Sequence, residues 1–160
     1  MCKCFNKRAF EKYFCRNQEW LRLLKKEKTI SFLLTRSNHI LIECKINYVS
    51  GTFIVDTGAS NSCINYLSAS KFNVEFKKSN ETASSATNQI NETYYSKNNK
   101  LKIEDFQKND FDLVLFDMTF INNSLKEKGV SELDGIIGGD ILNELNVCIN
   151  YKKKEINLEF

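Results

Sequence analysis

The sequence predicts a mainly β domain preceded by an amphipathic helix, and three observations carry this prediction. Short runs rich in β-branched and aromatic residues, separated by polar turn residues, recur from residue 29 to the end of the chain. Two of these runs, at residues 52–55 and 133–137, lead into turns that combine acidic residues with glycine. Residues 5–28 instead place their apolar side chains near a period of about 3.6 residues, which is typical of a helix with one apolar face.

The run at residues 52–55 ends in Asp56, Thr57 and Gly58. Its β-branched and aromatic residues predict a strand buried on both faces, and Gly58 permits the tight turn that must follow. A carboxylate is therefore expected at the end of a rigid strand. Taken alone, the same three residues are also compatible with an ordinary strand-to-loop turn and a solvated aspartate.

Residues 133–142, with the sequence Leu-Asp-Gly-Ile-Ile-Gly-Gly-Asp-Ile-Leu, repeat this design. An apolar strand ends in glycines and enters a short helix, for which Asp140 is the predicted N-cap. Together the two motifs resemble the retropepsin-like aspartic proteases, in which an Asp-Thr-Gly-Ala loop is backed by an Ile-Ile-Gly segment that leads into a helix. The resemblance covers residues 29–160 and implies the half-barrel of an acid protease, with a short helix after the Ile-Ile-Gly motif.

Length, charge and the start of the chain narrow the classes of function. At 160 residues the chain is predicted to form one domain, or one domain and an appendage. Its net charge of +3, from 23 basic and 20 acidic residues, is too small to indicate nucleic-acid binding. No apolar run is long enough to span a membrane, and residues 1–4 lack the apolar core of a signal peptide, so a cytoplasmic location is expected.

The six cysteines are expected to be reduced thiols, because the predicted location is not an oxidising compartment. Three of them fall in apolar segments and are interpreted as small core residues, namely Cys44, Cys63 and Cys148. The other three have neither a second pair of ligands nor a nearby histidine, so no metal site is predicted at Cys2, Cys4 and Cys15. His39, the single histidine, is interpreted as a strand or turn residue rather than the base of a cysteine protease.

Charge separates the first 28 residues from the rest. They carry nine basic and three acidic residues, a balance of +6, so the remainder of the chain holds +3 minus +6, or −3. This asymmetry divides the chain into a basic amphipathic helical appendage at 1–28 and a protease-like domain at 29–160. Such a helix could dock on an acidic membrane surface or a partner. The interpretation we favour is that its aromatic stripe packs against its own domain or against a second subunit.

The remaining elements are predicted from period and turn residues. Strands at 30–34 and 40–48 flank a turn at 36–38, and one or two helical turns at 65–72 use Leu67 as their apolar contact. The later elements follow in order: strands at 101–106 and 111–116 around a turn at 108–110, a helix at 122–128 closed by Gly129, and a hairpin of 147–151 and 155–158 around three lysines.

Residues 77–99 are polar and would pass for a surface loop by composition. The resemblance gives them another meaning, because the corresponding segment of retropepsin-like enzymes contains a β-hairpin flap that closes over bound peptide. Residues 83–90 lie in that place, and the implied substrate contacts at the flap tip are Ala86, Thr87 and Asn88. Viral relatives commonly carry glycines at this tip, whereas this stretch has none.

Two departures from the viral pattern agree with one another. Viral retropepsins often place an acid directly after Asp-Thr-Gly-Ala and pair it with an arginine after the Ile-Ile-Gly glycine. Here those places hold Ser60 and Gly139, so both halves of the ion pair are missing together and no unpaired buried charge remains. The pattern is more similar to the cellular or bacterial branch than to a viral enzyme.

An aspartic protease needs two carboxylates in close contact that share one proton, one acting as base toward water and the other donating to the scissile carbonyl. The chain has a single Asp-Thr-Gly, while Asp134 and Asp140 are interpreted as turn or helix-capping residues. The second carboxylate must then come from Asp56 of another copy, which implies a two-fold homodimer with the cleft across its axis.

The resemblance also implies a role for each residue of the loop. Asp56, Thr57 and Gly58 are the catalytic residues, with Thr57 bracing the paired loops and Gly58 offering its backbone to substrate. Ala59 keeps the floor of the cleft narrow and is assigned, with Ser60, to substrate binding. No metal or organic cofactor is required. The sequence therefore predicts an aspartic endopeptidase that acts on peptides or proteins.

Two other classes of function stay open. One is a catalytically inactive module that keeps the retropepsin fold for binding or assembly, and the glycine-free flap favours it. The other is an adaptor at a membrane surface, led by the basic helix. The intact sequence from Asp56 to Ala59 favours the enzyme.

Overall fold

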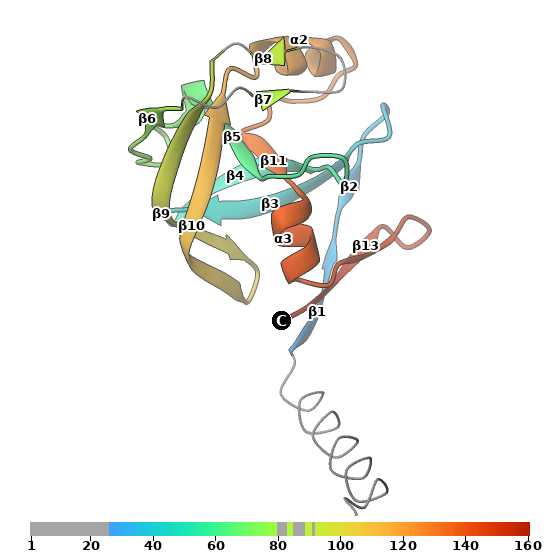
Figure 1. Cartoon of the computed structure of the whole chain (residues 1–160). Coiled ribbons are helices and arrows are strands. Elements are labelled where there is room, and N and C mark those ends of the chain that lie inside the picture. Colours follow the sequence, from blue (N-terminus) through green and yellow to red (C-terminus); the bar gives the residue numbers. More distant parts are fainter. Residues whose placement is uncertain (1–25, 80–82, 85–88, 91) are drawn as a thin grey trace, which may run out of the picture.

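The computed structural model describes residues 26–79, 83–84, 89–90 and 92–160. This part of the chain is mainly β, as predicted, with few helices (Figure 1). Its elements in chain order are β1 (Glu27–Ser31), β2 (Leu33–Leu34), β3 (Ile40–Ile46), β4 (Val49–Val55), β5 (Cys63–Asn65), the 3-10 helix η1 (Tyr66–Ser68), β6 (Lys77–Lys78), β7 (Ala83–Ser84), β8 (Gln89–Ile90), β9 (Tyr94–Ile103), β10 (Phe106–Phe116), α2 (Thr119–Glu127), β11 (Gly135–Ile137), α3 (Gly139–Glu144), β12 (Cys148–Asn150) and β13 (Glu155–Glu159).

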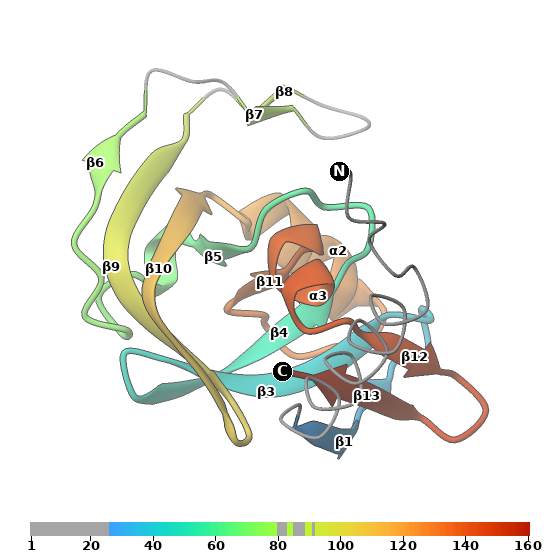
Figure 2. The same cartoon turned by 60° about the horizontal axis from the view of Figure 1, so that its bottom comes forward.

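The largest sheet closes into a barrel (Figure 2). Its strand order is β2-β3-β4-β11-β5-β10-β9-β6, and an additional pairing of β3 with β9 joins the two sides. β11 lies parallel to β4 and antiparallel to β5, so a strand from late in the chain is inserted between two early strands. The barrel is therefore complete only when both halves of the chain are in place.

The last three residues of β4, at 53–55, and the three residues of β11 are covered on both faces, which explains why both segments are apolar. Phe53 and Val55 pack in the larger core cluster, whereas Ile54 packs in a second cluster formed with α2. On β11, Ile137 and Ile136 divide between the two clusters in the same way. Because successive strand side chains point to opposite faces, neither of these segments has a solvent face, whereas Ser50 near the start of β4 is exposed. The predicted strand buried on both faces is confirmed.

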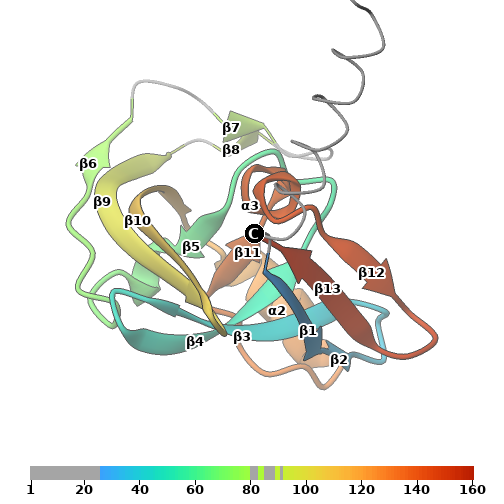
Figure 3. The ribbon, with the colours of Figure 1, turned by 90° about the horizontal axis from the view of Figure 1, so that it is seen from below.

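A separate three-stranded sheet, ordered β1-β13-β12, brings the first and last described strands together (Figure 3). β1 pairs antiparallel with β13 along its full length, from Glu27 opposite Glu159 to Ser31 opposite Glu155. Backbone hydrogen bonds of 2.6 and 2.9 Å between residues 26 and 160 extend this ladder. β12 covers the other edge of β13, so the predicted C-terminal hairpin is confirmed.

The predicted N-terminal helix is wrong at its last two residues, which belong to β1. The helical period extends to residue 28, but Glu27 and Lys28 belong to a strand. Their partner strand, β13, lies about 130 residues further along the chain, and a long-range pairing of this kind overrides local propensity. Residues 1–25, which include Cys2, Cys4 and Cys15 and the rest of the predicted helix, lie outside the described residues.

The β9–β10 hairpin turns at a different place from the prediction. The turn lies between Ile103 and Phe106, and the predicted turn residues 108–110 belong to β10. The pairing register shifts between Lys108 and Phe111, and Asp110 there has a φ of 56°. The polar residues therefore mark a β-bulge, which bends a strand without ending it.

The segment after β5 forms one short 3-10 turn, and its predicted apolar contact is wrong. Leu67 is 62% exposed. The neighbouring Tyr66 ring packs instead against Phe76 and Tyr94, with ring centroids 5.2 and 4.8 Å apart.

The helix α2 begins at Thr119, three residues before the predicted start. It is followed by Gly129 with a φ of 74°, the left-handed conformation that ends many helices. Among the described residues, no helix combines the length and apolarity needed to cross a membrane.

Truncation tests where the folded domain begins. Removing residues 1–25 is expected to leave a folded domain, whereas removing residues 1–31 deletes β1 and the buried Ile30. Losing the strand and its isoleucine should lower the free energy of unfolding by at least about 2 kcal/mol. Urea unfolding followed by far-ultraviolet circular dichroism compares the two truncations with the full chain. Equal unfolding midpoints for both truncations would show that β1 does not stabilise the domain.

Candidate active site

The backbone around Asp56 is held by the end of β11. β11 runs parallel to β4, with Ile137 opposite Val55, and the Asp56 N–H donates to the Ile137 carbonyl at 3.0 Å. A tight turn follows, in which the Ala59 N–H donates to the Asp56 carbonyl at 3.2 Å. The Gly58 N–H donates to Asp56 Oδ1 at 2.8 Å, so the loop orients one oxygen of the carboxylate.

The outward side of the loop is open. Asp56, Thr57, Gly58 and Ser60 are exposed, and Ala59 is half-buried. Within the part of the chain that the structure describes, neither Asp56 Oδ2 nor the Thr57 hydroxyl has a hydrogen-bond partner. Two polar groups at the tip of a rigid strand are therefore available to a substrate or to another chain.

The start of α3 holds the loop from the opposite side. The Gly139 N–H donates to the Ala59 carbonyl at 2.7 Å, and the Asp140 N–H donates to the Ser60 carbonyl at 3.1 Å. Gly138 allows this approach, because a Cβ atom there would lie only 2.7 Å from the backbone carbon and oxygen of Asn61. The Ile-Ile-Gly motif thus supports the Asp56 loop through backbone contacts, which require glycine at this position.

Asp140 has a different role from the one predicted. The N-cap of α3 is Gly138, and Asp140 lies in the first turn of the helix. Asp140 Oδ1 accepts hydrogen bonds from the Ser62 N–H at 2.9 Å, from Ser62 Oγ at 2.7 Å and from the Ile141 N–H at 2.9 Å. Its carboxylate therefore joins α3 to the far end of the Asp56 loop.

Ser62 completes this link and was not identified from the sequence. Its hydroxyl donates to Asp140 and accepts from the Gly138 N–H at 3.0 Å, and the residue is only 1% exposed. Ser62 and Asp140 are 78 positions apart, so no local sequence pattern predicts their contact. The one available signal is a hydroxyl residue immediately before an apolar strand.

Asp134 lies at the opposite end of β11 from the loop. Its Oδ2 accepts from the Thr52 N–H at 2.9 Å, and Lys71 Nζ pairs with Oδ1 at 2.8 Å. These contacts fix the start of the β4–β11 ladder and agree with the predicted structural role. The carboxylates of Asp134 and Asp140 are thus both bound to other groups. Neither is free to serve, beside Asp56, as a second catalytic carboxylate.

The described cysteines lack the properties of a nucleophile at this site. Burial raises the pKa of the Cys63 thiol to about 12, with a further contribution from Asp140 and Asp56. Burial also raises the pKa of Cys44 well above its usual range. Cys44 and Cys63 are buried core residues, as predicted. Cys148 is exposed on β12, so its predicted place in the core is wrong. Both buried thiols stay protonated at neutral pH.

His39 lies in the turn between β2 and β3, as predicted. The ring Nδ1 of His39 is 2.8 Å from Ser37 Oγ, and the backbone N–H of His39 donates to Thr35 Oγ1 at 2.9 Å. These bonds are local to the turn and give the ring a structural partner.

The segment predicted as a flap contains one antiparallel pair. β7 and β8 pair with Ala83 opposite Ile90 and Ser84 opposite Gln89. Figures 2 and 3 show this pair on the side of the barrel from which the β4–β5 loop emerges. The three predicted substrate contacts, Ala86, Thr87 and Asn88, lie outside the described residues.

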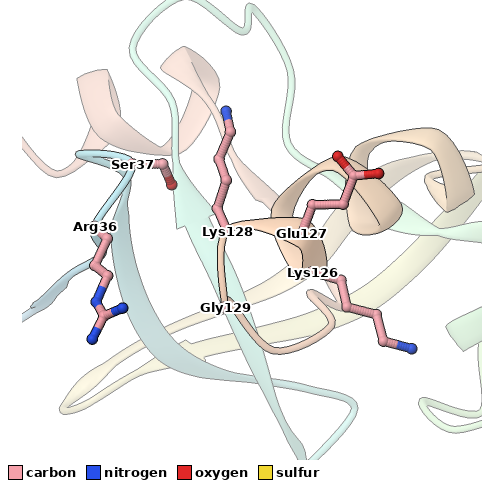
Figure 4. Close-up of a pocket in the computed structure, with 6 residues that line it drawn as sticks. All are labelled: Arg36, Ser37, Lys126, Glu127, Lys128 and Gly129. Carbon is pink, nitrogen blue, oxygen red and sulfur yellow. The ribbon is translucent and has the colours of Figure 1, made fainter.

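A shallow hollow elsewhere on the surface is unrelated to the loop. It lies between the β2–β3 turn and the end of α2, and its lining residues are Arg36, Ser37, Lys126, Glu127, Lys128 and Gly129. Figure 4 shows the charged ends of Arg36, Lys126 and Lys128 pointing in different directions. The hollow therefore does not gather its charges on one point, as a specific anion site would.

Removing the Ser62 hydroxyl tests the link between α3 and the loop. Ser62→Ala leaves the buried Gly138 N–H without its acceptor and takes one donor from Asp140, so the free energy of unfolding should fall by about 1–3 kcal/mol. Ser62→Thr keeps the hydroxyl and should recover part of that loss. Urea unfolding at one pH measures the series. The exposed Ser70→Ala is the control, and equal stability of Ser62→Ala and Ser70→Ala would contradict the assignment.

One family model matches this chain over both of its glycine-containing turns. The family model for aspartyl proteases matches residues 42–141, which is more than half of the chain and includes the Asp-Thr-Gly-Ala and Ile-Ile-Gly sequences. No curated protein matches the sequence.

Two solved structures are similar in fold. A retropepsin-like aspartic protease from Rickettsia conorii gives a TM-score of 0.60 at 19% identity, covering 85% of this chain and 93% of that chain. EIAV protease, in complex with the inhibitor HBY-793, gives a TM-score of 0.52 at 16% identity, covering 69% of this chain and 91% of that chain. These likenesses confirm the predicted retropepsin-like fold. With the family match over both motifs, they lead to one conclusion: the chain belongs to the aspartyl protease family.

Proposed function

We propose that the protein is an aspartic endopeptidase, which hydrolyses peptide bonds with a water molecule activated by two Asp56 carboxylates, one from each subunit of a homodimer. One observation carries the proposal. In a chain of the aspartyl protease family, Asp56 stands at the end of a buried strand with one carboxylate oxygen held by the Gly58 N–H and the other open to solvent.

Two carboxylates in contact cannot both be ionised easily, so the pair holds one proton between them. The ionised carboxylate takes a proton from water as the water oxygen attacks the scissile carbonyl carbon. The protonated carboxyl donates its proton to the carbonyl oxygen, which gives a tetrahedral diol. When the diol collapses, the carbon–nitrogen bond breaks. The protonated carboxyl gives its proton to the leaving amine, and one diol hydroxyl gives its proton to the ionised carboxylate, so the pair again holds one proton.

The other acids near the motif support the need for a second chain. The carboxylate of Asp134 is bound to Thr52 and Lys71, and that of Asp140 to Ser62 and Ile141. Neither can approach Asp56 without losing these bonds. A two-fold axis beside the loop would instead bring two copies of Asp56 together and give each Thr57 hydroxyl a partner across the axis.

The substrate in this proposal is an extended peptide or a protein segment. Gly58 offers backbone groups to the substrate, while Ala59 and Ser60 line the floor of the cleft. The β7–β8 pair is the base of a flap whose tip, with Ala86, Thr87 and Asn88, covers the bound peptide. A flap without glycine has less conformational freedom than one with it, and this feature favours the second candidate, an inactive binding or assembly module.

Asp56→Asn distinguishes the two candidates. The substitution is nearly isosteric and should preserve the fold, while it removes the ionisable pair from every mutant homodimer. Cleavage of a peptide found in a library digest should fall by roughly a hundredfold or more. Asp105→Asn, at an exposed acid outside the loop, is the control and should cleave normally. Full activity of Asp56→Asn would overturn the mechanism, and an inert wild-type chain would favour the binding module.

Mixing the two proteins tests whether the site is shared. If Asp56→Asn is added in equal amount to wild type and subunits pair at random, about a quarter of all dimers are fully wild type. Roughly half the activity of the same wild-type protein alone should then remain. Activity that stays unchanged on mixing, while sedimentation shows exchanged subunits, would mean that one chain suffices.

A further inference from the structure

We infer that the surface around the β3–β4 turn is a docking site for a short acidic segment of a partner protein. Its residues are Lys45, Tyr48, Lys100 and Lys102, and we call this set the lysine–tyrosine surface. The inference goes beyond the proposed activity and does not depend on it. β4 has seven residues, about 20 Å in length, and separates the turn from the Asp56 loop. Figure 2 shows the turn and the β4–β5 loop at opposite ends of β4.

The first observation is that two lysines stand directly opposite each other. β3 pairs antiparallel with β9, and Lys45 is the partner of Lys102. Directly opposite side chains lie on the same face of a sheet, with Cβ atoms about 4.5–5.5 Å apart, so like charges there destabilise the ladder. Both lysines are exposed, and among the described residues no acid forms an ion pair with either. An acidic partner would relieve a repulsion that the fold leaves in place.

The acids that are closest in sequence have other neighbours. Glu43 lies two positions before Lys45 on β3, and its partner across the ladder is Thr52. In the β9–β10 turn, Asp105 forms an ion pair with Lys28 of β1 at 3.1 Å. The hydrogen bond and the charge of Asp105 raise the pKa of Lys28, and Glu104 adds a smaller contribution. These two acids therefore act on β1 rather than on the opposed lysines.

The second observation is the conformation of Tyr48. The turn has positive φ at both central residues, 47° at Asn47 and 72° at Tyr48, and such a turn favours glycine at its second position. A bulky residue in this region is strained. Tyr48 is 68% exposed, so burial of its ring does not compensate for the strain. Lys100 Nζ donates to the Tyr48 hydroxyl at 2.6 Å and lies 4.9 Å from the ring centroid, which holds a third cation beside the ring.

A network of hydrogen bonds from Asn47 holds this turn in place. The Asn47 N–H donates to the Lys100 carbonyl at 2.9 Å, and Asn47 Oδ1 accepts from the Lys100 N–H at 2.9 Å. Asn47 Nδ2 donates to the Phe72 carbonyl and to Asn99 Oδ1, both at 3.1 Å. Strain persists where the surroundings fix it, and such residues cluster at functional sites. Tyr48 is therefore presented to solvent in one orientation, which lowers the entropy lost when a partner binds.

The chemistry of the surface favours an acidic protein segment. Its three lysines are separate point charges on two strands, so they suit carboxylates spread along an extended chain better than one compact anion. Tyrosine is a frequent anchor of protein interfaces, and surrounding charges steer and select the partner. Residues 29–160 carry a net charge of −3, so a long polyanion or an anionic membrane would also meet the acids of this domain. A short acidic segment meets the lysine–tyrosine surface alone.

Tyr48→Gly separates a binding role from a structural one. The probe is a fluorescein-labelled peptide of six glutamates, and its anisotropy is measured with the full chain at low ionic strength. Losing the ring should weaken binding by about fivefold or more. Because glycine relieves the strain, Tm should rise by about 2–4 °C. Unchanged affinity, or weaker binding together with a lower Tm, would overturn the assignment of Tyr48.

The opposed lysines are tested by a double substitution with a matched control. Lys45→Gln with Lys102→Gln should weaken binding of the same peptide by about tenfold, since two exposed charge pairs are lost. The control is Lys77→Gln with Lys153→Gln, which changes the net charge equally at exposed lysines of β6 and of the β12–β13 turn. It should bind as wild type does. Equal affinities of the two double variants would mean that net charge alone attracts the peptide, and would overturn the site.

The remaining outcomes concern the kind of partner and the link to catalysis. Asp56→Asn should bind the acidic peptide as wild type does, so an inert enzyme would overturn the peptidase and keep the docking site. A peptide of six glutamines should not bind. Tighter binding of a six-nucleotide DNA strand or of phosphatidylserine vesicles than of the acidic peptide would overturn the choice of partner. An acidic peptide that does not bind at low ionic strength would overturn the inference as a whole.

Discussion

The close approach of β11 to β4 and β5 is the constraint on which the rest of the structure depends. β11 has only three residues, and it lies between β4 and β5 in the order of the barrel sheet. A Cβ atom at Gly135 would overlap the carbonyl oxygen of Cys63, and one at Gly138 would press on Asn61. The glycines therefore set the spacing between the strands, and that spacing places Ile137 where it receives the Asp56 N–H.

The loop at the end of β4 is consequently rigid on its inner side and open on its outer side. β11, the start of α3 and the Ser62–Asp140 pair hold its backbone, while the free oxygen of Asp56 and the Thr57 hydroxyl face outward. A group that is already oriented needs little rearrangement when charge develops beside it, which is how preorganised sites accelerate reactions. In the proposed mechanism, a single chain of this design supplies one of the two carboxylates of the site.

Local patterns were sufficient to predict the parts of the fold that depend on neighbours in the sequence. The apolar run before Asp56 predicted β4, the Ile-Ile-Gly motif predicted β11 and α3, and Gly129 marked the end of α2. Prediction failed where a distant partner decides the outcome. Lys28 joins a strand because β13 pairs with it, Asp140 turns away from the helix cap because Ser62 lies within reach, and Asp110 sits in a bulge because β9 continues alongside. None of these partners is visible from a window of neighbouring residues.

The central claim is that two Asp56 carboxylates from different chains form one site, and the stoichiometry of inhibitor binding tests it most directly. A statine-type peptide mimics the tetrahedral intermediate and binds a competent pair of carboxylates far more tightly than a substrate. Isothermal titration calorimetry should give one inhibitor for every two chains, and no binding to Asp56→Asn. One inhibitor for each chain, or undiminished binding to Asp56→Asn, would contradict the shared site.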